Sequence, residues 1–266
     1  MFLTKKSLRR IRLLTSAYII LGMICFIISL IFSYFLVEYK LLVILGIVSL
    51  ILGALFHMSG KYAEDKGKLL NSGNQLVLFE LRPTEFVRLF EEKRDCPDNV
   101  IVKPDFDVLQ LLVVAYEAMG DTDRTLGTLE YMLSIVPEKK RTLVKILQCS
   151  VLFDVGRTAE AEALYAQLLN SKMDIISKST FDILTKNDRA MAMGDFTTAE
   201  AHNRQMLSQS FPHITPLVSL GIHLNLAKIC CKTERIEEAK AHLNYCIDNG
   251  GETVIKKEAI DILSNI

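Results

Sequence analysis

The stretch LQLLVVAYEAMG, residues 109–120, decides the fold class. Leu109, Leu112 and Tyr116 recur at spacings of three and four residues, which places them on one face of a helix. Gly120 and the polar residues after it end that helix in a turn. The stretch therefore predicts the first helix of a helical hairpin.

Similar turns are centred on Gly156 and Gly194, and a less regular one lies at Glu234. When Gly120, Gly156, Gly194 and Glu234 are taken as equivalent, consecutive turns are separated by 36, 38 and 40 residues. One helical pattern precedes each turn and another follows it. Because a hairpin of this size cannot bury its apolar face alone, neighbouring hairpins must stack. The chain is thus predicted to be all-α, with an α-solenoid of about four helical hairpins.

The repeating unit resembles the tetratricopeptide repeat family, whose unit is about 34 residues long. Several positions match the family pattern of apolar, aromatic, small and helix-ending residues: Leu109, Leu112, Tyr116, Gly120, Leu129, Pro137, Gly156, Ala161, Tyr165, Gly194, Ala199, Met206, Ala227, Ala239, Leu243 and Cys246. Others depart from it, since Val113 and Cys149 replace small residues, Thr125 replaces alanine and Asn203 replaces an aromatic residue. The resemblance implies a TPR-like fold over residues 104–266. Val254–Ile266 follows the last hairpin and is expected to be a capping helix.

The same resemblance implies a concave groove lined by the first helix of each unit. Carried over position by position, the candidate partner groove consists of Gln110, Val114, Glu117, Ile146, Ser150, Phe153, Leu184, Asp188, Met191, Leu224 and Lys228. Most of these side chains are apolar, which favours an amphipathic helix or an extended apolar peptide as the partner. In the alternative interpretation they only pack between helices, or against an amphipathic helix expected at Pro83–Lys93.

The charge of the chain is unevenly distributed. Its 266 residues carry 31 basic and 31 acidic side chains. Residues 1–58 have six basic side chains against Glu38 alone, a net charge of +5, so the remainder has a net charge of −5. Two uncharged runs, 13–37 and 41–58, lie in the basic part. As helices they would be about 37 and 27 Å long, close to the thickness of a bilayer core.

These runs predict a transmembrane hairpin over residues 1–60, followed by a juxtamembrane segment over 61–103 that contains the amphipathic helix. The first run is too long for a cleaved signal peptide. Basic residues flank both outer ends, which predicts a multi-pass integral protein of the cell membrane with both termini in the cytoplasm. Small residues four apart, Ser29 with Ser33 and Ser49 with Gly53, favour packing within the hairpin, or a homo-oligomer through it.

No motif for catalysis, for a cofactor or for a metal is found in the sequence. The six cysteines form no C-x-x-C pair. His242 and Cys246 lie one helical turn apart and could supply half a metal site, but no second pair accompanies them. The acidic balance of the repeat part disfavours nucleic acid. We therefore expect no catalytic, cofactor-binding or metal-binding residues, and a protein or peptide as the partner.

Together these features predict a non-enzymatic, membrane-anchored adaptor or scaffold that presents a TPR-like domain at the cytoplasmic face. Two alternatives remain open. One is a membrane-associated enzyme, which a cluster of perturbed carboxylates in a pocket would favour. The other is an envelope or export factor with its repeats outside the cell.

Overall fold

The computed structural model describes residues 23–24, 27, 40–95, 105–208 and 214–266. The chain divides into two compact units. One consists of residues 1–71 and 96–102, and the other of residues 72–95 and 103–266. The described residues form helices and no strand, which confirms the prediction of an all-α chain.

The first unit contains most of α2, Lys40–Asn74. This helix begins in the second apolar run and continues without a break into the charged stretch Lys61–Lys68. The run 41–58 is thus one end of a longer, mixed helix. Nowhere in the described part of the chain is a helix long and apolar enough to cross a membrane.

That finding contradicts the predicted localisation as a multi-pass integral membrane protein with both termini in the cytoplasm. Residues 41–58 are uncharged, but the helix that holds them also includes five charged residues in its next turns. The first predicted span, 13–37, lies almost entirely outside the described residues. The predicted two-helix anchor therefore has no support in the structure.

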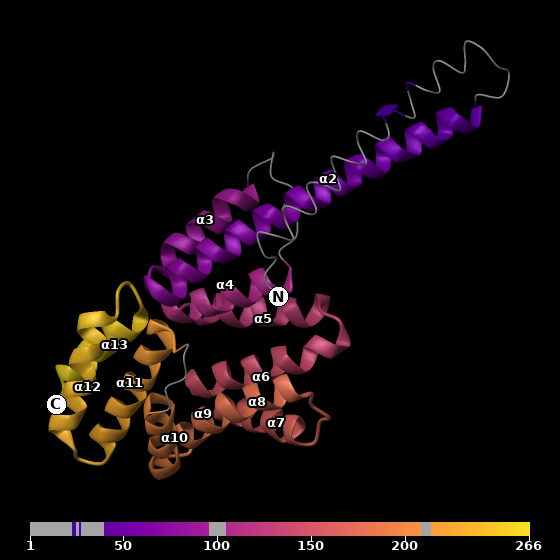
Figure 1. Cartoon of the computed structure of the whole chain (residues 1–266). Coiled ribbons are helices and arrows are strands. Elements are labelled where there is room, and N and C mark those ends of the chain that lie inside the picture. Colours follow the sequence, from indigo (N-terminus) through magenta and orange to yellow (C-terminus); the bar gives the residue numbers. More distant parts are fainter. Residues whose placement is uncertain (1–22, 25–26, 28–39, 96–104, 209–213) are drawn as a thin grey trace. The chain divides into compact units, whose positions relative to one another are not determined.

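The second unit carries the repeated hairpins (Figure 1). It starts with the last residues of α2, from Ser72, and continues with the π-helical turn η1 and these helices: η1 Gln75–Phe79, α3 Pro83–Asp95, α4 Phe106–Met119, α5 Thr122–Ile135, α6 Glu138–Asp154, α7 Thr158–Leu169, α8 Ile175–Ile183, α9 Thr185–Ala192, α10 Phe196–Ser208, α11 Pro216–Lys232, α12 Ile236–Asn249 and α13 Val254–Leu263.

Each helix pair is joined by a turn whose residue adopts the left-handed conformation. Gly120, Gly156 and Gly194 have φ values of 75°, 75° and 73°, a region that glycine enters without a steric penalty. Glu234 has a φ of 59° at the equivalent place in the fourth hairpin. Because the backbone is the same at all four positions, the alignment of the repeats by their turns is correct even where glycine is missing.

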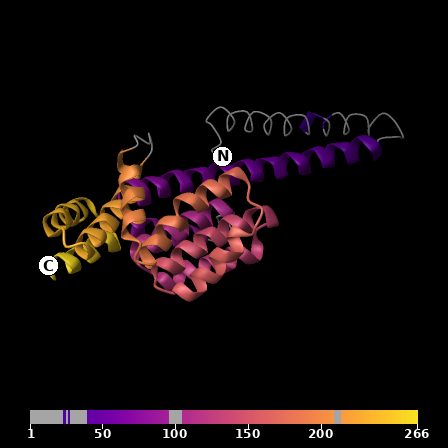
Figure 2. The same ribbon diagram turned by 90° about the horizontal axis from the view of Figure 1, so that it is seen from below.

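The hairpins pack as a helical repeat solenoid does. Helix α4 pairs with α5, α6 with α7, α9 with α10, and α11 with α12, and successive hairpins also touch (Figure 1, and the rotated view of Figure 2). The second helix of each pair presents a small residue to the first: Thr125, Ala161, Ala199 and Ala239 are all at most 1% exposed. Small side chains at these crossings let the two backbones approach closely.

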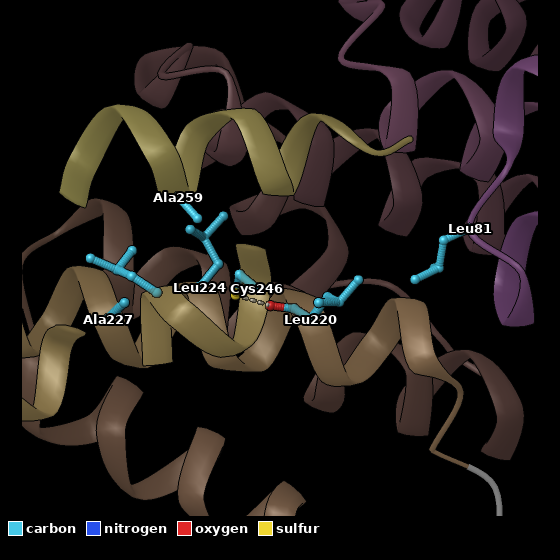
Figure 3. Close-up of a cluster of buried hydrophobic side chains, with 7 residues drawn as sticks. Leu81, Leu220, Leu224, Ala227, Cys246 and Ala259 are labelled. Carbon is cyan, nitrogen blue, oxygen red and sulfur yellow. Dashed lines mark hydrogen bonds between the residues drawn. The ribbon is translucent and has the colours of Figure 1, made fainter. Parts of the chain in front are cut away.

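The end of the unit packs against its beginning. Helix α13 contacts α4, and α11 contacts η1. Leu81, just after η1, lies in a cluster with Leu220 and Leu224 of α11, Cys246 of α12 and Ala259 of α13 (Figure 3). The backbone N–H of Glu252 donates to the Leu81 carbonyl oxygen at 2.9 Å. The stack of hairpins within this unit is therefore closed by contacts between segments far apart in the sequence.

Candidate functional site

A pocket of about 690 Å³ lies among the first helices of the hairpins. Helices α4, α6, α9, α11 and α13 all contribute side chains to it, and the N-terminal turn of α5 closes one side. Natural ligand pockets occupy a few hundred to about a thousand Å³, so this one could hold a ligand or a segment of a partner. No residue of α3 lines it, so the Pro83–Asp95 helix does not fill the groove.

Five of the eleven predicted groove residues line this pocket: Val114, Glu117, Asp188, Leu224 and Lys228. The other six do not. Ile146 and Phe153 belong to the core between α6, α7 and α8, and Ser150 is buried beside the pocket. Gln110, Leu184 and Met191 are half-buried outside it.

The difference on α6 is one of register. The pocket side of this helix is formed by Val151, Asp154 and Val155, whereas the predicted face was Ile146, Ser150 and Phe153. A shift of one residue rotates a helical face by about 100°. The longer intervals between turns made this register ambiguous in the sequence, and Asp154 was missed for that reason.

Four carboxylates surround the pocket, and they come from four helices: Glu117 of α4, Asp154 of α6, Asp188 of α9 and Glu258 of α13. The ammonium group of Lys228 lies 2.7 Å from a carboxylate oxygen of Glu258 and neutralises it. Asp188 accepts a short hydrogen bond from the hydroxyl of Ser150.

Three of these carboxylates have pKa values above the ordinary ones. Surrounding protein raises the pKa of Glu117 to about 8, and the nearby charge of Asp154 adds to this. The surrounding protein also raises the pKa of Asp154 to about 6, against the opposing effect of Lys228. Burial and the charge of Asp154 also raise the pKa of Asp188. Each of the three groups is therefore harder to ionise than an ordinary carboxyl group.

Solvent reaches these groups in spite of the protein around them. Glu117 and Asp154 are exposed and Asp188 is half-buried, because their side chains face the hollow of the pocket. Water in the pocket therefore screens part of their mutual repulsion. Much of the remaining lining is apolar and consists of Val114, Ala118, Val151, Val155, Leu217, Leu224, Val254 and Ile255.

His242 and Cys246, which could have supplied half a metal site, make other contacts in the structure. The thiol of Cys246 is buried and donates to the carbonyl oxygen of Leu220 at 3.6 Å. His242 faces His223, with 2.8 Å between their Nδ1 atoms, and Tyr245 stacks on His223 at 3.9 Å between ring centroids. Nowhere in the described part of the chain do three metal-ligating side chains converge, the pocket carboxylates included.

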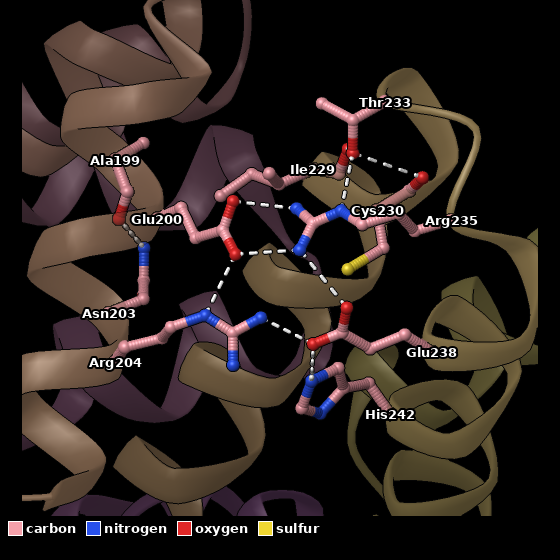
Figure 4. A network of polar contacts seen from close by, with 10 residues as sticks. All are labelled: Ala199, Glu200, Asn203, Arg204, Ile229, Cys230, Thr233, Arg235, Glu238 and His242. Atoms are coloured by element: carbon pink, nitrogen blue, oxygen red, sulfur yellow. Dashed lines mark hydrogen bonds and ion pairs between the residues drawn. The ribbon is translucent and has the colours of Figure 1, made fainter.

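A second polar group ties the third hairpin to the fourth. Glu200 and Arg204 of α10 form a closed set of ion pairs with Arg235 and Glu238 of the α12 start (Figure 4). It lies outside the pocket lining. Its role is structural, since every charge in it is matched by an opposite one.

Comparison with family models, curated proteins and solved structures finds no match to this chain.

Proposed function

We propose that the chain is a protein–protein interaction scaffold whose pocket binds a segment of a partner protein. The observation that carries this proposal is the convergence of all four hairpins and α13 on one hollow of about 690 Å³. Concave surfaces built from successive helices are what repeat proteins use for recognition. Membrane anchoring forms no part of the proposal.

We further assign the hairpins to the tetratricopeptide class of repeats. Two features support this. The first is a left-handed residue in each turn at intervals of 36, 38 and 40 residues. The second is a small buried residue at each helix crossing, as at Ala161 and Ala239. The pocket carries carboxylates that would repel phosphates, which disfavours nucleic acid as the partner.

Site-specific photocrosslinking tests the binding site. Val218 lines the pocket and is 42% exposed, whereas Ile260 of α13 is 46% exposed and lies outside the lining. A photoreactive amino acid at position 218 is expected to capture a discrete partner from cells, and the same residue at position 260 is not. Identical crosslinking patterns at the two positions would refute the pocket as the binding site.

A variant that fills the pocket provides a second test of the binding site. A Cβ added at Gly221, which lines the pocket on α11, meets no atom within 4 Å, so a side chain can start there, and Gly221→Phe should place its ring in the pocket. Gly127 on α5 has the same open surroundings outside the pocket. Gly221→Phe should abolish the crosslink made from position 218, and Gly127→Phe should leave it intact.

One observation favours a second function, a general acid–base enzyme. Neighbouring carboxylates with raised pKa values, such as Glu117 and Asp154, are common in active sites. The two functions differ in what becomes of the bound molecule. A scaffold releases its partner with unchanged mass after prolonged incubation, whereas an enzyme alters it and stops doing so in Glu117→Gln.

A further inference from the structure

The carboxylates of the pocket outnumber its cations. Lys228 is the one basic side chain in the lining, and Glu258 already pairs with it. Glu117 and Asp154 form no hydrogen bond or ion pair with a described residue that would balance their charge, and Asp188 has only neutral donors. The pocket lining therefore has an excess of negative charge, which a positively charged ligand would balance.

Glu117 is the clearest case. Protein surrounds its carboxylate closely enough to raise its pKa to about 8, yet the side chain faces the hollow, where water reaches it. An unpaired carboxylate that is directed into a pocket beside another carboxylate is costly for the fold to keep ionised. Stability alone would favour a neutral residue at this position.

Two helix ends at the pocket increase this cost. Glu117 lies in the last turn of α4, and Asp154 is the last residue of α6. The C-terminal end of a helix carries partial negative charge, so it destabilises a carboxylate and stabilises a cation. These two ends favour a cation, whereas the first turns of α5, α11 and α13, which also line the pocket, carry partial positive charge.

The pocket wall adds a second requirement. Val114 and Ala118 precede and follow Glu117 by one turn or less on α4, and Val151 stands one turn before Asp154 on α6. Leu224 and Ile255 face the same hollow. A ligand that fits must carry positive charge at one end and an aliphatic stem next to it, as lysine and arginine side chains do.

We propose that the pocket recognises a basic side chain of the partner segment, with its cationic group among Glu117, Asp154 and Asp188 and its aliphatic stem on the apolar wall. This specificity rests on the proposed function, since it names the chemistry of the segment that the pocket binds. It also replaces the expectation of an apolar partner, because the register of α6 places Asp154 at the pocket in place of Phe153.

A matched pair of peptides tests the specificity on the full chain. One is acetyl-Trp-Leu-Arg-Leu-Ala amide, and the other has neutral citrulline in place of arginine. The protein contains no tryptophan, so the fluorescence of the peptide reports binding without background. The arginine peptide should bind at least about tenfold more tightly, as expected for a charge met by carboxylates in a partly enclosed site.

The protein variants identify the groups responsible. In the double variant Glu117→Gln with Asp154→Asn, the preference for arginine over citrulline should fall to about twofold or less. The control is Glu130→Gln with Asp248→Asn, the same two changes at exposed positions outside the pocket, and it should keep the full preference. Circular dichroism and Tm confirm that both variants are folded.

The pH dependence gives an independent readout. Cation binding requires ionised carboxylates, so affinity for the arginine peptide should rise from pH 5 to pH 9 while that for the citrulline peptide stays level. The groups facing Glu117 are Asp154, Asp188, and the Lys228–Glu258 pair. At pH 7 the binding should release protons, which calorimetry in buffers of different ionisation enthalpy measures.

Several outcomes would overturn the proposal: equal affinity for the two peptides, no binding of either at millimolar concentration, or an undiminished preference in the double variant. Tighter binding of spermidine than of the arginine peptide, lost in the double variant, would assign the pocket to a free polyamine instead. If the peptides fail while position 218 still crosslinks its partner, the scaffold function stands and only the basic specificity is wrong. If the crosslinking pattern also fails, both are wrong.

Discussion

At the scale of single residues, Glu117 contributes to the pH dependence of the protein's stability. Its pKa rises from 4.5 to about 8 on folding, so the folded state favours the protonated form. The resulting stability is fully present below pH 4.5 and is lost as the pH rises through about 8. Glu117→Gln should match the wild type below pH 4.5 and exceed its Tm at pH 9.

The expected gain is about 2 °C, since water in the pocket screens the group. Thermal unfolding followed by circular dichroism across the pH range measures it. Glu130→Gln, at an exposed position, should show the same pH profile as the wild type. A Tm difference for Glu117→Gln that does not change with pH would contradict the raised pKa.

The turn glycines Gly120 and Gly156 provide a second residue-level comparison. Both have a φ of 75°, so alanine at either position costs about 1 kcal/mol through the left-handed backbone. At Gly156 the space is open, but at Gly120 a Cβ would lie 2.8 Å from a methyl carbon of Val254. Gly120→Ala should therefore cost about 1 kcal/mol more than Gly156→Ala in urea unfolding.

A double-mutant cycle isolates that contact. In a Val254→Ala background most of the extra cost of Gly120→Ala should vanish, because the methyl group at 2.8 Å is gone and only the Cβ of residue 254, at 3.2 Å, stays close. If Gly120→Ala and Gly156→Ala cost the same in the wild-type background, α13 does not pack against this turn in solution.

At the scale of elements, the ion-pair network joins α10 to α12. Arg235 donates to both carboxylate oxygens of Glu200 at 2.6 and 2.8 Å, and Arg204 donates to one of them at 2.7 Å. These bonds lower the pKa of Glu200 from 4.5 to about 2. The stability they supply is present above pH 4.5 and is lost as the pH falls through about 2.

Glu200→Gln should consequently lower the free energy of unfolding by about 1–2 kcal/mol at pH 7, measured in urea. Near pH 2 the variant and the wild type should be equally stable. The control is Glu237→Gln on α12, whose side chain is 88% exposed and pairs only with Lys240, and it should change stability little at either pH. An equal effect of the two substitutions at pH 7 would show that the network adds nothing beyond ordinary surface pairs.

The elements also show what the sequence could and could not predict. Turn spacing identified all four hairpins, even where Glu234 takes the backbone conformation of a glycine. The first helix of the third hairpin was expected to be continuous, but it breaks at Leu184 into α8 and α9. The hydroxyl of Thr185 donates to the Phe181 carbonyl oxygen at 2.6 Å, a local bond that bends helices and has no periodic signature.

At the scale of the whole chain, local patterns were least informative. The hydropathy pattern predicted a membrane hairpin because residues 41–58 were considered separately from the charged residues that follow them. In the structure both belong to the one helix α2. Gly251 follows the end of α12 and has a φ of 54°, but a contact far away in the sequence also requires glycine there. A Cβ there would lie 2.7 Å from both the Cβ and the carbonyl oxygen of Leu81.

The packing of Leu81 against the last helices of the unit leads to a prediction about stability. In an open solenoid each repeat contacts only its neighbours, so a change near residue 81 would affect only the nearby hairpin. Here Leu81 is 5% exposed and packs into the cluster of α11, α12 and α13. Leu81→Ala keeps the backbone bond to Glu252 and should cost about 2–4 kcal/mol through the cavity it leaves.

Hydrogen exchange locates that cost. Leu81→Ala should speed amide exchange in α11, α12 and α13, although these helices lie far from residue 81 in the sequence. Leu168→Ala removes a side chain that is 2% exposed in the cluster of the second hairpin, and it should act first on α6 and α7. If Leu81→Ala leaves α11–α13 unchanged and speeds exchange only around residue 81, the stack is open at this end, and the pocket lacks the α13 wall that its proposed specificity requires.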